Sequence, residues 1–287
     1  MQQFIVQTLN GLTLAGIMFL VSSGFTLVFG VMRITNLAHG AFYLVGGYIA
    51  YSAISITGNF FVGLLVAMVA MGLLGVLLER TLIKRMRGQV MAELLATLGL
   101  VYVIDDLALA IWGGDPLSIR LPGFLSDSVT LPGGIVYPIG RIFIFLVATG
   151  IGLGLFFLLR RTRVGAIIRA GVDNRAMVSA MGINVRLVFT AVFALGAVLA
   201  GAGGVLGGSV LSLAPGEDAY ILTFALIVVI VGGLGSFEGA VLGSLIVGLL
   251  SNYGQAYFPA LAYFALFAPL VAVLLVRPQG LLGKATA

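Results

Sequence analysis

Long apolar stretches alternate with short polar ones along the whole chain. The apolar runs are continuous over about 20 residues, the length that an α-helix needs to cross a bilayer. A membrane β-barrel would instead show segments of about ten residues with alternating polarity. We therefore predict an all-α, polytopic membrane protein of eight to nine membrane-spanning helices, built as a single transmembrane domain over residues 1–287. The predicted spans are 4–32, 41–57, 60–78, 94–112, 139–158, 188–213, 219–231, 240–257 and 260–276.

Glycine marks the points where these helices are expected to break or to pack closely. The sequence GGLGS at 232–236 holds too much glycine for a straight helix and predicts a turn. Within span 188–213, Gly196, Ala200, Gly204 and Gly208 recur every four residues, which lets two helix backbones approach closely. Such a stripe could pack inside one chain or against a second subunit, and the sequence leaves both open.

The composition excludes several classes of protein. Hydrophobic residues make up 61% of the chain and charged residues 9%, whereas soluble domains carry about 25% charged residues. There is no cysteine, and a single histidine cannot build a multi-histidine metal site. Motifs for a P-loop, a serine hydrolase or a zinc protease are absent from the sequence. We expect no enzyme activity, no metal and no cofactor bound by this chain.

The charge distribution predicts how the chain is oriented. The net charge of +5 comes from basic residues at the ends of spans, so it reflects topology and not a nucleic-acid surface. Basic residues favour cytoplasmic loops, which places 79–93, 160–187 and the C-terminal tail in the cytoplasm. The proline-rich stretch 113–138 and the N-terminus are then periplasmic. The N-terminus lacks the basic region of a signal peptide, so the first span is expected to be retained.

The segment 160–187 is the longest interruption of the apolar pattern. It contains six of the fifteen basic residues and one acid. Residues 172–181 are rich in Ala, Met and Val, which predicts a short helix. A short helix at the membrane surface suits contact with a partner protein. The alternative is a plain basic loop that only sets the topology.

This segment resembles the cytoplasmic coupling loop of bacterial ABC importer permeases, in particular those for branched-chain amino acids and related amides or urea. Three further stretches resemble that family in order: NLAHG at 36–40, GLGS at 233–236 with Gly239 and Ala240, and RPQGL at 277–281. The resemblance implies ATPase-coupling residues, which are Gly165, Arg169, Asp173, Asn174, Ala176 and Gly182.

The resemblance also implies a function and a set of partners. The chain would be the permease subunit of an ATP-driven importer that works by alternating access in the bacterial inner membrane. It would pair with a second permease subunit, identical or different, and with a periplasmic substrate-binding protein. Two cytoplasmic ATPase subunits would bind the ATP, since this chain has no nucleotide motif.

Polar residues in apolar surroundings, close to the ends of the spans, suggest further sites. Asn36 and His39, with Tyr43, could belong to a broken helix that lines the substrate path. A cytoplasmic turn beside Arg33 would explain Asn36 and His39 equally well. The acidic pair Glu217 and Asp218 is expected in a periplasmic surface turn. There it could dock the binding protein or simply be solvated.

Asp105 and Asp106 interrupt the apolar span 94–112. Adjacent residues point to different faces of a helix, so these two are not expected to act as a carboxylate pair. Intramembrane acids and glycine-rich broken helices also suit a different class of protein, an ion-coupled secondary transporter or channel. Dependence on an ATPase distinguishes the two classes.

Overall fold

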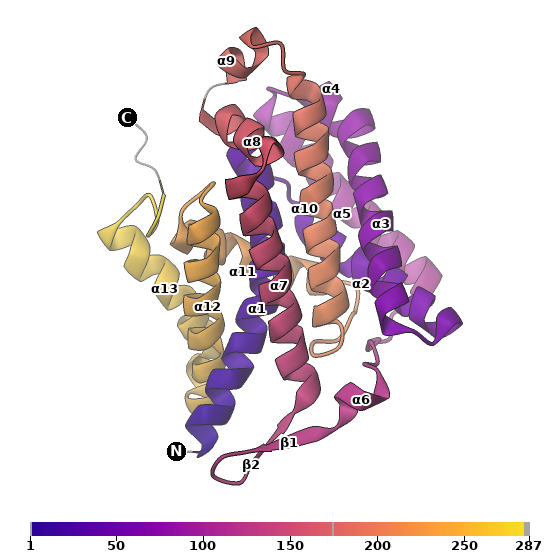
Figure 1. Ribbon diagram of the computed structural model, residues 1–287, viewed down its shortest axis with the longest axis vertical. Coiled ribbons are helices and arrows are strands. Elements are labelled where there is room, and N and C mark those ends of the chain that lie inside the picture. The colour runs from indigo at the N-terminus through magenta and orange to yellow at the C-terminus, as the bar shows by residue number, and fades with distance from the viewer. Residues whose placement is uncertain (1, 174, 284–287) are drawn as a thin grey trace.

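The computed structural model describes residues 2–173 and 175–283, with the side chains of 172–176 outside the description. Helices dominate it, as predicted (Figure 1). The long helices are α1 (Gln2–Met32), α2 (His39–Thr57), α3 (Phe60–Leu78), α5 (Val90–Trp112), α7 (Ile139–Arg161), α10 (Val185–Gly207), α11 (Glu217–Gly232), α12 (Phe237–Tyr257) and α13 (Ala262–Val276). The short elements are η1 (Glu79–Ile83), α4 (Lys84–Met86), α6 (Gly123–Ser126), α8 (Arg163–Asp173), α9 (Arg175–Ala180) and η2 (Pro259–Leu261), together with strands β1 (Ser128–Leu131) and β2 (Ile135–Pro138).

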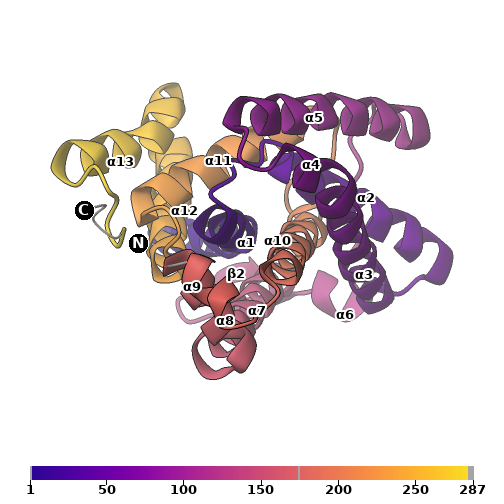
Figure 2. The same ribbon diagram turned by 90° about the horizontal axis from the view of Figure 1, so that it is seen from above.

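Helix α1 is the centre of the bundle. Viewed from above, α7, α10, α11 and α12 surround it, while α3, α5 and α13 lie farther out (Figure 2). Among the described residues, seven helices are long and apolar enough to cross a membrane, and counting the bent pair α11–α12 as one span gives eight. The chain direction bends by 117° between the two helices of that pair. Eight is the lower end of the predicted range, and the turn predicted at GGLGS is confirmed by the positive φ angles of Gly233 and Gly235.

Local chemistry sets the ends of the helices. Gly58 ends α2 in the left-handed conformation, with φ of 67°. The next residue, Asn59, starts α3: its side-chain oxygen accepts hydrogen bonds from the backbone amides of Phe61 and Val62, at 2.9 and 3.2 Å. Such N-caps satisfy amides that have no partner within the helix. Two antiparallel apolar helices therefore follow each other with almost no loop.

A small β-hairpin departs from the predicted all-helical pattern. Strands β1 and β2 pair antiparallel, and the link between them contains Gly133 and Gly134, both at positive φ. The side-chain amide of Gln2 donates to the Gly133 carbonyl at 2.8 Å, so the start of α1 lies at this hairpin end. Helices α8 and α9 lie at the opposite end, called here the α8 end (Figure 1). The hairpin and the N-terminus therefore lie at one end of the bundle, and α8 and α9 lie at the other.

The small-residue stripe of α10 packs inside this chain. A Cβ atom added to Gly24 of α1 would lie 2.7 Å from the carbonyl oxygen of Gly196. One added to Gly204 would overlap the carbonyl oxygen of Tyr43 in α2. The backbones of α1, α10 and α2 are therefore in direct contact, which supports the first of the two interpretations of the stripe.

A buried charge ties α3 to α10 at the α8 end. Glu79, at the first position of the π-helical turn η1, is 2% exposed and pairs with Arg87. The hydroxyl of Thr190 in α10 donates to the second oxygen of Glu79 at 2.6 Å. The Arg87 guanidinium also lies 4.4 Å above the ring of Phe189. Both oxygens of the buried carboxylate are thereby satisfied, as a charge in a low-dielectric site requires.

Replacing Thr190 with valine should remove one of these bonds without changing the shape of the side chain. Hydrogen bonds to charged groups contribute about 1.5–3 kcal/mol, so we expect the free energy of unfolding in detergent to fall by about 2 kcal/mol. The matched control is Thr149→Val in α7, because the Thr149 hydroxyl is exposed and bonds only the carbonyl of Phe145 in its own helix. Equal destabilisation by the two variants would contradict the role of Glu79.

Candidate functional site

Helix α8 folds back on the end of α7 through a glycine. The amide of Gly165 donates to the hydroxyl of Thr162 at 3.1 Å, which caps the new helix. A Cβ atom at position 165 would overlap the carbonyl oxygens of Leu158 and Leu159. Only glycine lets the two helices approach this closely, so Gly165 fixes the position of α8.

The buried face of α8 rests on the last turn of α1. Ile168 is 4% exposed, and a Cβ atom at Gly171 would lie 4.0 Å from Val31. Val31 stands just before the point where α1 ends at Met32. The opposite face of α8 is exposed and includes the basic residues Arg163 and Arg169. A force on the exposed face would therefore reach the end of α1 directly.

The structure places the predicted coupling residues on two elements. Gly165 and Arg169 lie on α8, the first buried and the second exposed. Gly182 is exposed beyond α9, with a φ of 77° that favours glycine. The predicted residues Asp173, Asn174 and Ala176 lie outside the described side chains. Helix α9 falls inside the predicted 172–181, whereas α8 was not predicted, although its buried Gly165, Ile168 and Gly171 recur every three residues.

A break between α1 and α2 carries the polar residues Asn36 and His39 inside the bundle. Asn36 is 1% exposed, and its side-chain oxygen accepts from the amide of Ala38 at 3.2 Å. The Leu37 amide donates to the Thr97 hydroxyl of α5 at 3.3 Å. The His39 Nε2 atom lies 2.9 Å from the carbonyl oxygen of Val21, well inside α1. Asn36 and His39 are therefore buried, which contradicts a surface turn beside Arg33, and they lie where α1 ends and α2 begins.

Helix α11 begins at the same place. The carbonyl oxygen of Asp218 approaches Gly40 so closely that a Cβ on Gly40 would overlap it. Asp218 is buried, and Glu217 is partly exposed. The prediction of a solvated or docking surface turn is therefore wrong for Asp218, because α2 covers it. Two helix N-termini meet inside the bundle, an arrangement by which transporters present helix dipoles to a solute.

Among the residues that the structure describes, several buried polar atoms of α1, α2, α5, α11 and the link between α1 and α2 have no hydrogen-bond partner. They are Ser22 Oγ, Thr26 Oγ1, Asn36 Nδ2, His39 Nδ1, Tyr43 OH, Tyr48 OH, Asp105 Oδ1 and Asp218 Oδ1. Unsatisfied buried polar groups are costly and rare in folded proteins, and more so inside a membrane. These atoms are able to bond water or a polar solute. They include those of the predicted Asn36, His39 and Tyr43, and also Tyr48, which the sequence analysis did not single out.

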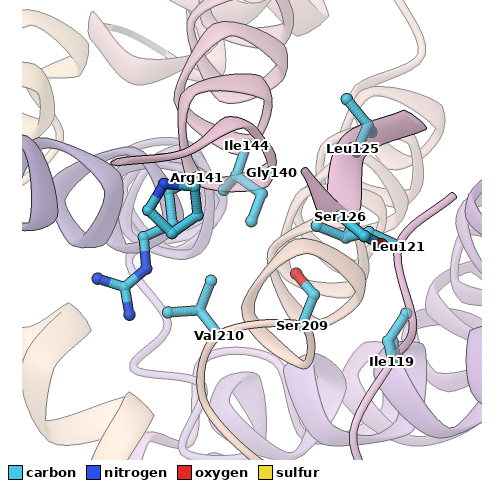
Figure 3. Close-up of a pocket in the computed structure, with 10 residues that line it drawn as sticks. Ile119, Leu121, Leu125, Ser126, Gly140, Arg141, Ile144, Ser209 and Val210 are labelled. Atoms are coloured by element: carbon cyan, nitrogen blue, oxygen red, sulfur yellow. The ribbon is translucent and has the colours of Figure 1, made fainter. Parts of the chain in front are cut away.

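A separate pocket of about 290 Å³ lies at the hairpin end. Arg141 of α7, Ser209 and Val210 after α10, and Leu125 of α6 line it (Figure 3). The Arg141 guanidinium donates to the side-chain oxygen of Asn10, so its charge is already engaged. This pocket is therefore a weaker candidate for a functional site than the helix breaks and α8.

Comparisons with known proteins identify the family of the chain. A family model described as a branched-chain amino acid transport system permease component matches residues 7–274. The chain is 28% identical to the high-affinity branched-chain amino acid transport system permease protein BraD of Pseudomonas aeruginosa, covering 98% of this chain and 96% of that protein.

Two further relatives are similar over most of the chain. The permease protein LivH of Escherichia coli K12 is 29% identical, again over 98% of this chain and 96% of the relative. The ribose import permease protein RbsC of Escherichia coli K12 is 27% identical over 89% of this chain and 79% of its own length. No solved structure matches the chain significantly.

Proposed function

Since the chain belongs to the family of permease components of branched-chain amino acid transport systems, we propose that it moves such an amino acid, or a related amide or urea, into the cytoplasm by alternating access. The observation that carries this proposal is the seat of α8 on the end of α1, immediately before the break that holds Asn36 and His39. Through this contact, a movement of α8 at the membrane surface can displace the end of α1 and the buried polar residues that follow it.

The ATPase partners are proposed at the α8 end, which then faces the cytoplasm of a bacterium with the chain in its inner membrane. Two ATPase subunits would bind ATP and contact the exposed face of α8 and the segment through Gly182. ATP shifts the equilibrium only as far as it binds one conformation of the assembly better than the other. Motion of α8 would pass to α1, and the periplasmic binding protein would dock on the hairpin end.

A second permease subunit is proposed to cover the outer face of α5. That helix lies along the outside of the bundle (Figure 2). Only 17% of an apolar 18-residue stretch within it is buried. Asp106 is exposed on it, between the exposed apolar residues Val103 and Leu107. A carboxylate facing lipid inside the membrane is costly, so such residues almost always face protein or water. A partner permease, of the same or a different sequence, would provide that environment.

The test is to extract the chain gently from its native host and to follow leucine uptake in the same cells. We expect an ATPase to co-purify, and uptake to stop when ATP is depleted but to persist when ion gradients are collapsed. The ion-coupled alternative predicts the reverse. If no ATPase appears under any mild extraction and uptake survives ATP depletion, the importer proposal is wrong.

A further inference from the structure

The C-terminal segment 277–283, called here the tail, reverses the direction of the chain directly after α13. The amide of Gly280 donates to the carbonyl oxygen of Arg277 at 2.9 Å, and Pro278 holds the second position of this β-turn, where proline is favoured. Gly280 itself has a φ of 82°, which glycine adopts without strain. The turn brings the tail beside the junction of α11 and α12, residues 233–236, called here the α11–α12 turn (Figure 1).

The tail completes the hydrogen bonding at the end of α11. The last carbonyl groups of a helix have no partner within it. The amide of Leu281 donates to the carbonyl oxygen of Val231 at 2.9 Å. The amide of Leu282 donates to that of Gly232, also at 2.9 Å. Both acceptor residues are buried, and a buried carbonyl without a partner is costly, so these two bonds tie the tail firmly to α11.

Backbone contacts at glycines join the tail, the α11–α12 turn and α1. A Cβ atom added to Gly280 would lie 2.4 Å from the Cα of Gly233 and 2.5 Å from its nitrogen. Two residues farther along the turn, Gly235 meets α1, because a Cβ on Gly30 would lie 3.1 Å from the Cα of Gly235. The turn therefore touches the tail through Gly233 and the end of α1 through Gly235.

The end of α1 also carries α8, on a different face. Val31, next to Gly30, is the residue that a Cβ on Gly171 of α8 would meet at 4.0 Å. Successive residues of an α-helix point about 100° apart, and α8 and α12 lie on different sides of α1 (Figure 2). A push from α8 displaces α1 in a defined direction only if the elements on its other faces resist. A glycine-rich turn resists little by itself, so the bonds from the tail provide the resistance.

We propose that Gly280 and the backbone amides of Leu281 and Leu282 position the end of α1 for coupled uptake. They hold the α11–α12 turn in place, so that a movement of α8 displaces the end of α1 and not the turn. The inference rests on the proposed function and extends it to the tail, which that function left without a role. Because the tail acts through its backbone, its exposed side chains should be dispensable.

The test uses the permease reconstituted in liposomes with its ATPase subunits and leucine-loaded binding protein. Leu282→Pro removes the amide that bonds Gly232, whereas Leu282→Ala keeps the amide and removes only an exposed side chain. Leucine uptake and ATP hydrolysis are measured together, because their ratio does not depend on the amount of folded protein. Leu282→Pro should raise the ATP hydrolysed per leucine at least about ten-fold, since a misplacement of about 1 Å can cost a hundred-fold. Leu282→Ala should keep the wild-type ratio.

A second pair of variants tests the contact at Gly280. Gly280→Ala forces a Cβ against the backbone of Gly233 and should raise the ratio in the same way. Gly58→Ala is the matched control: its φ of 67° is also left-handed, but nothing lies within 4 Å of the added Cβ. We expect its ratio to equal that of wild type.

Wild-type ratios in both Leu282→Pro and Gly280→Ala would overturn the inference. A parallel fall of uptake and ATP hydrolysis at an unchanged ratio would also overturn it, because a purely structural role of the tail predicts that result. A wild-type chain that recruits no ATPase, or that takes up leucine without ATP hydrolysis, would instead sink the proposed function, and the inference with it.

Discussion

Gly204→Val should prevent the chain from accumulating as a folded membrane protein. The new Cβ would overlap the carbonyl oxygen of Tyr43 and lie 3.0 Å from the amide nitrogen of Gly47. Both obstacles are backbone atoms of α2, so no side-chain rotation relieves them. Overpacking costs about 1–3 kcal/mol when side chains can yield, so we expect a loss of about 3 kcal/mol or more here. Size-exclusion chromatography and thermal unfolding in mild detergent would measure it.

The matched control for this variant is Gly150→Val in α7. Nothing lies within 4 Å of a Cβ at position 150, so the same two methyl groups enter open space. We expect its yield and thermal midpoint to equal those of wild type. A Gly204→Val protein that is as stable as this control would show that α2 and α10 do not touch as described.

Gly165→Val should uncouple ATP hydrolysis from uptake. The valine side chain would be forced into the carbonyl oxygens of Leu158 and Leu159, which would lift α8 away from α7 and from its seat on Val31. The membrane-spanning helices do not depend on this contact, so the protein should accumulate normally. We expect leucine uptake to fall at least about ten-fold, because displacement of a positioned element by about 1 Å can cost a hundred-fold. ATP hydrolysis by the complex should continue.

Gly154→Val provides the comparison, since a Cβ on Gly154 in α7 meets nothing within 4 Å. Its uptake and its ratio of solute moved to ATP hydrolysed should be unchanged. The coupling role of α8 would be refuted if Gly165→Val retained wild-type uptake at equal expression. Loss of the protein from the membrane would instead assign Gly165 to folding.

The apolar pattern was enough to predict the helices, because each span is long and bounded by charges, glycines or caps. The sequence did not show whether the short polar stretches between helices lie at the surface or inside the bundle. Asn36 and Asp218 both stand in short polar stretches that look like surface turns, and their burial results from packing against α5 and α2. The hairpin at 128–138 was missed, although Gly133 and Gly134 between two short runs with β-branched residues are a turn signal.

The backbone contact between Gly24 and Gly196 constrains how this bundle can move. Neither glycine has a side chain, although Val28 of α1 lies against Gly196, so α10 can pivot against α1 there with little rearrangement of side chains. Two rods that rotate about a contact between their ends separate at one end and converge at the other. A rotation of this kind would open the hairpin end only while closing the α8 end. The contact between Gly24 and Gly196 would thus act as a pivot that keeps the hairpin end and the α8 end from being open at the same time.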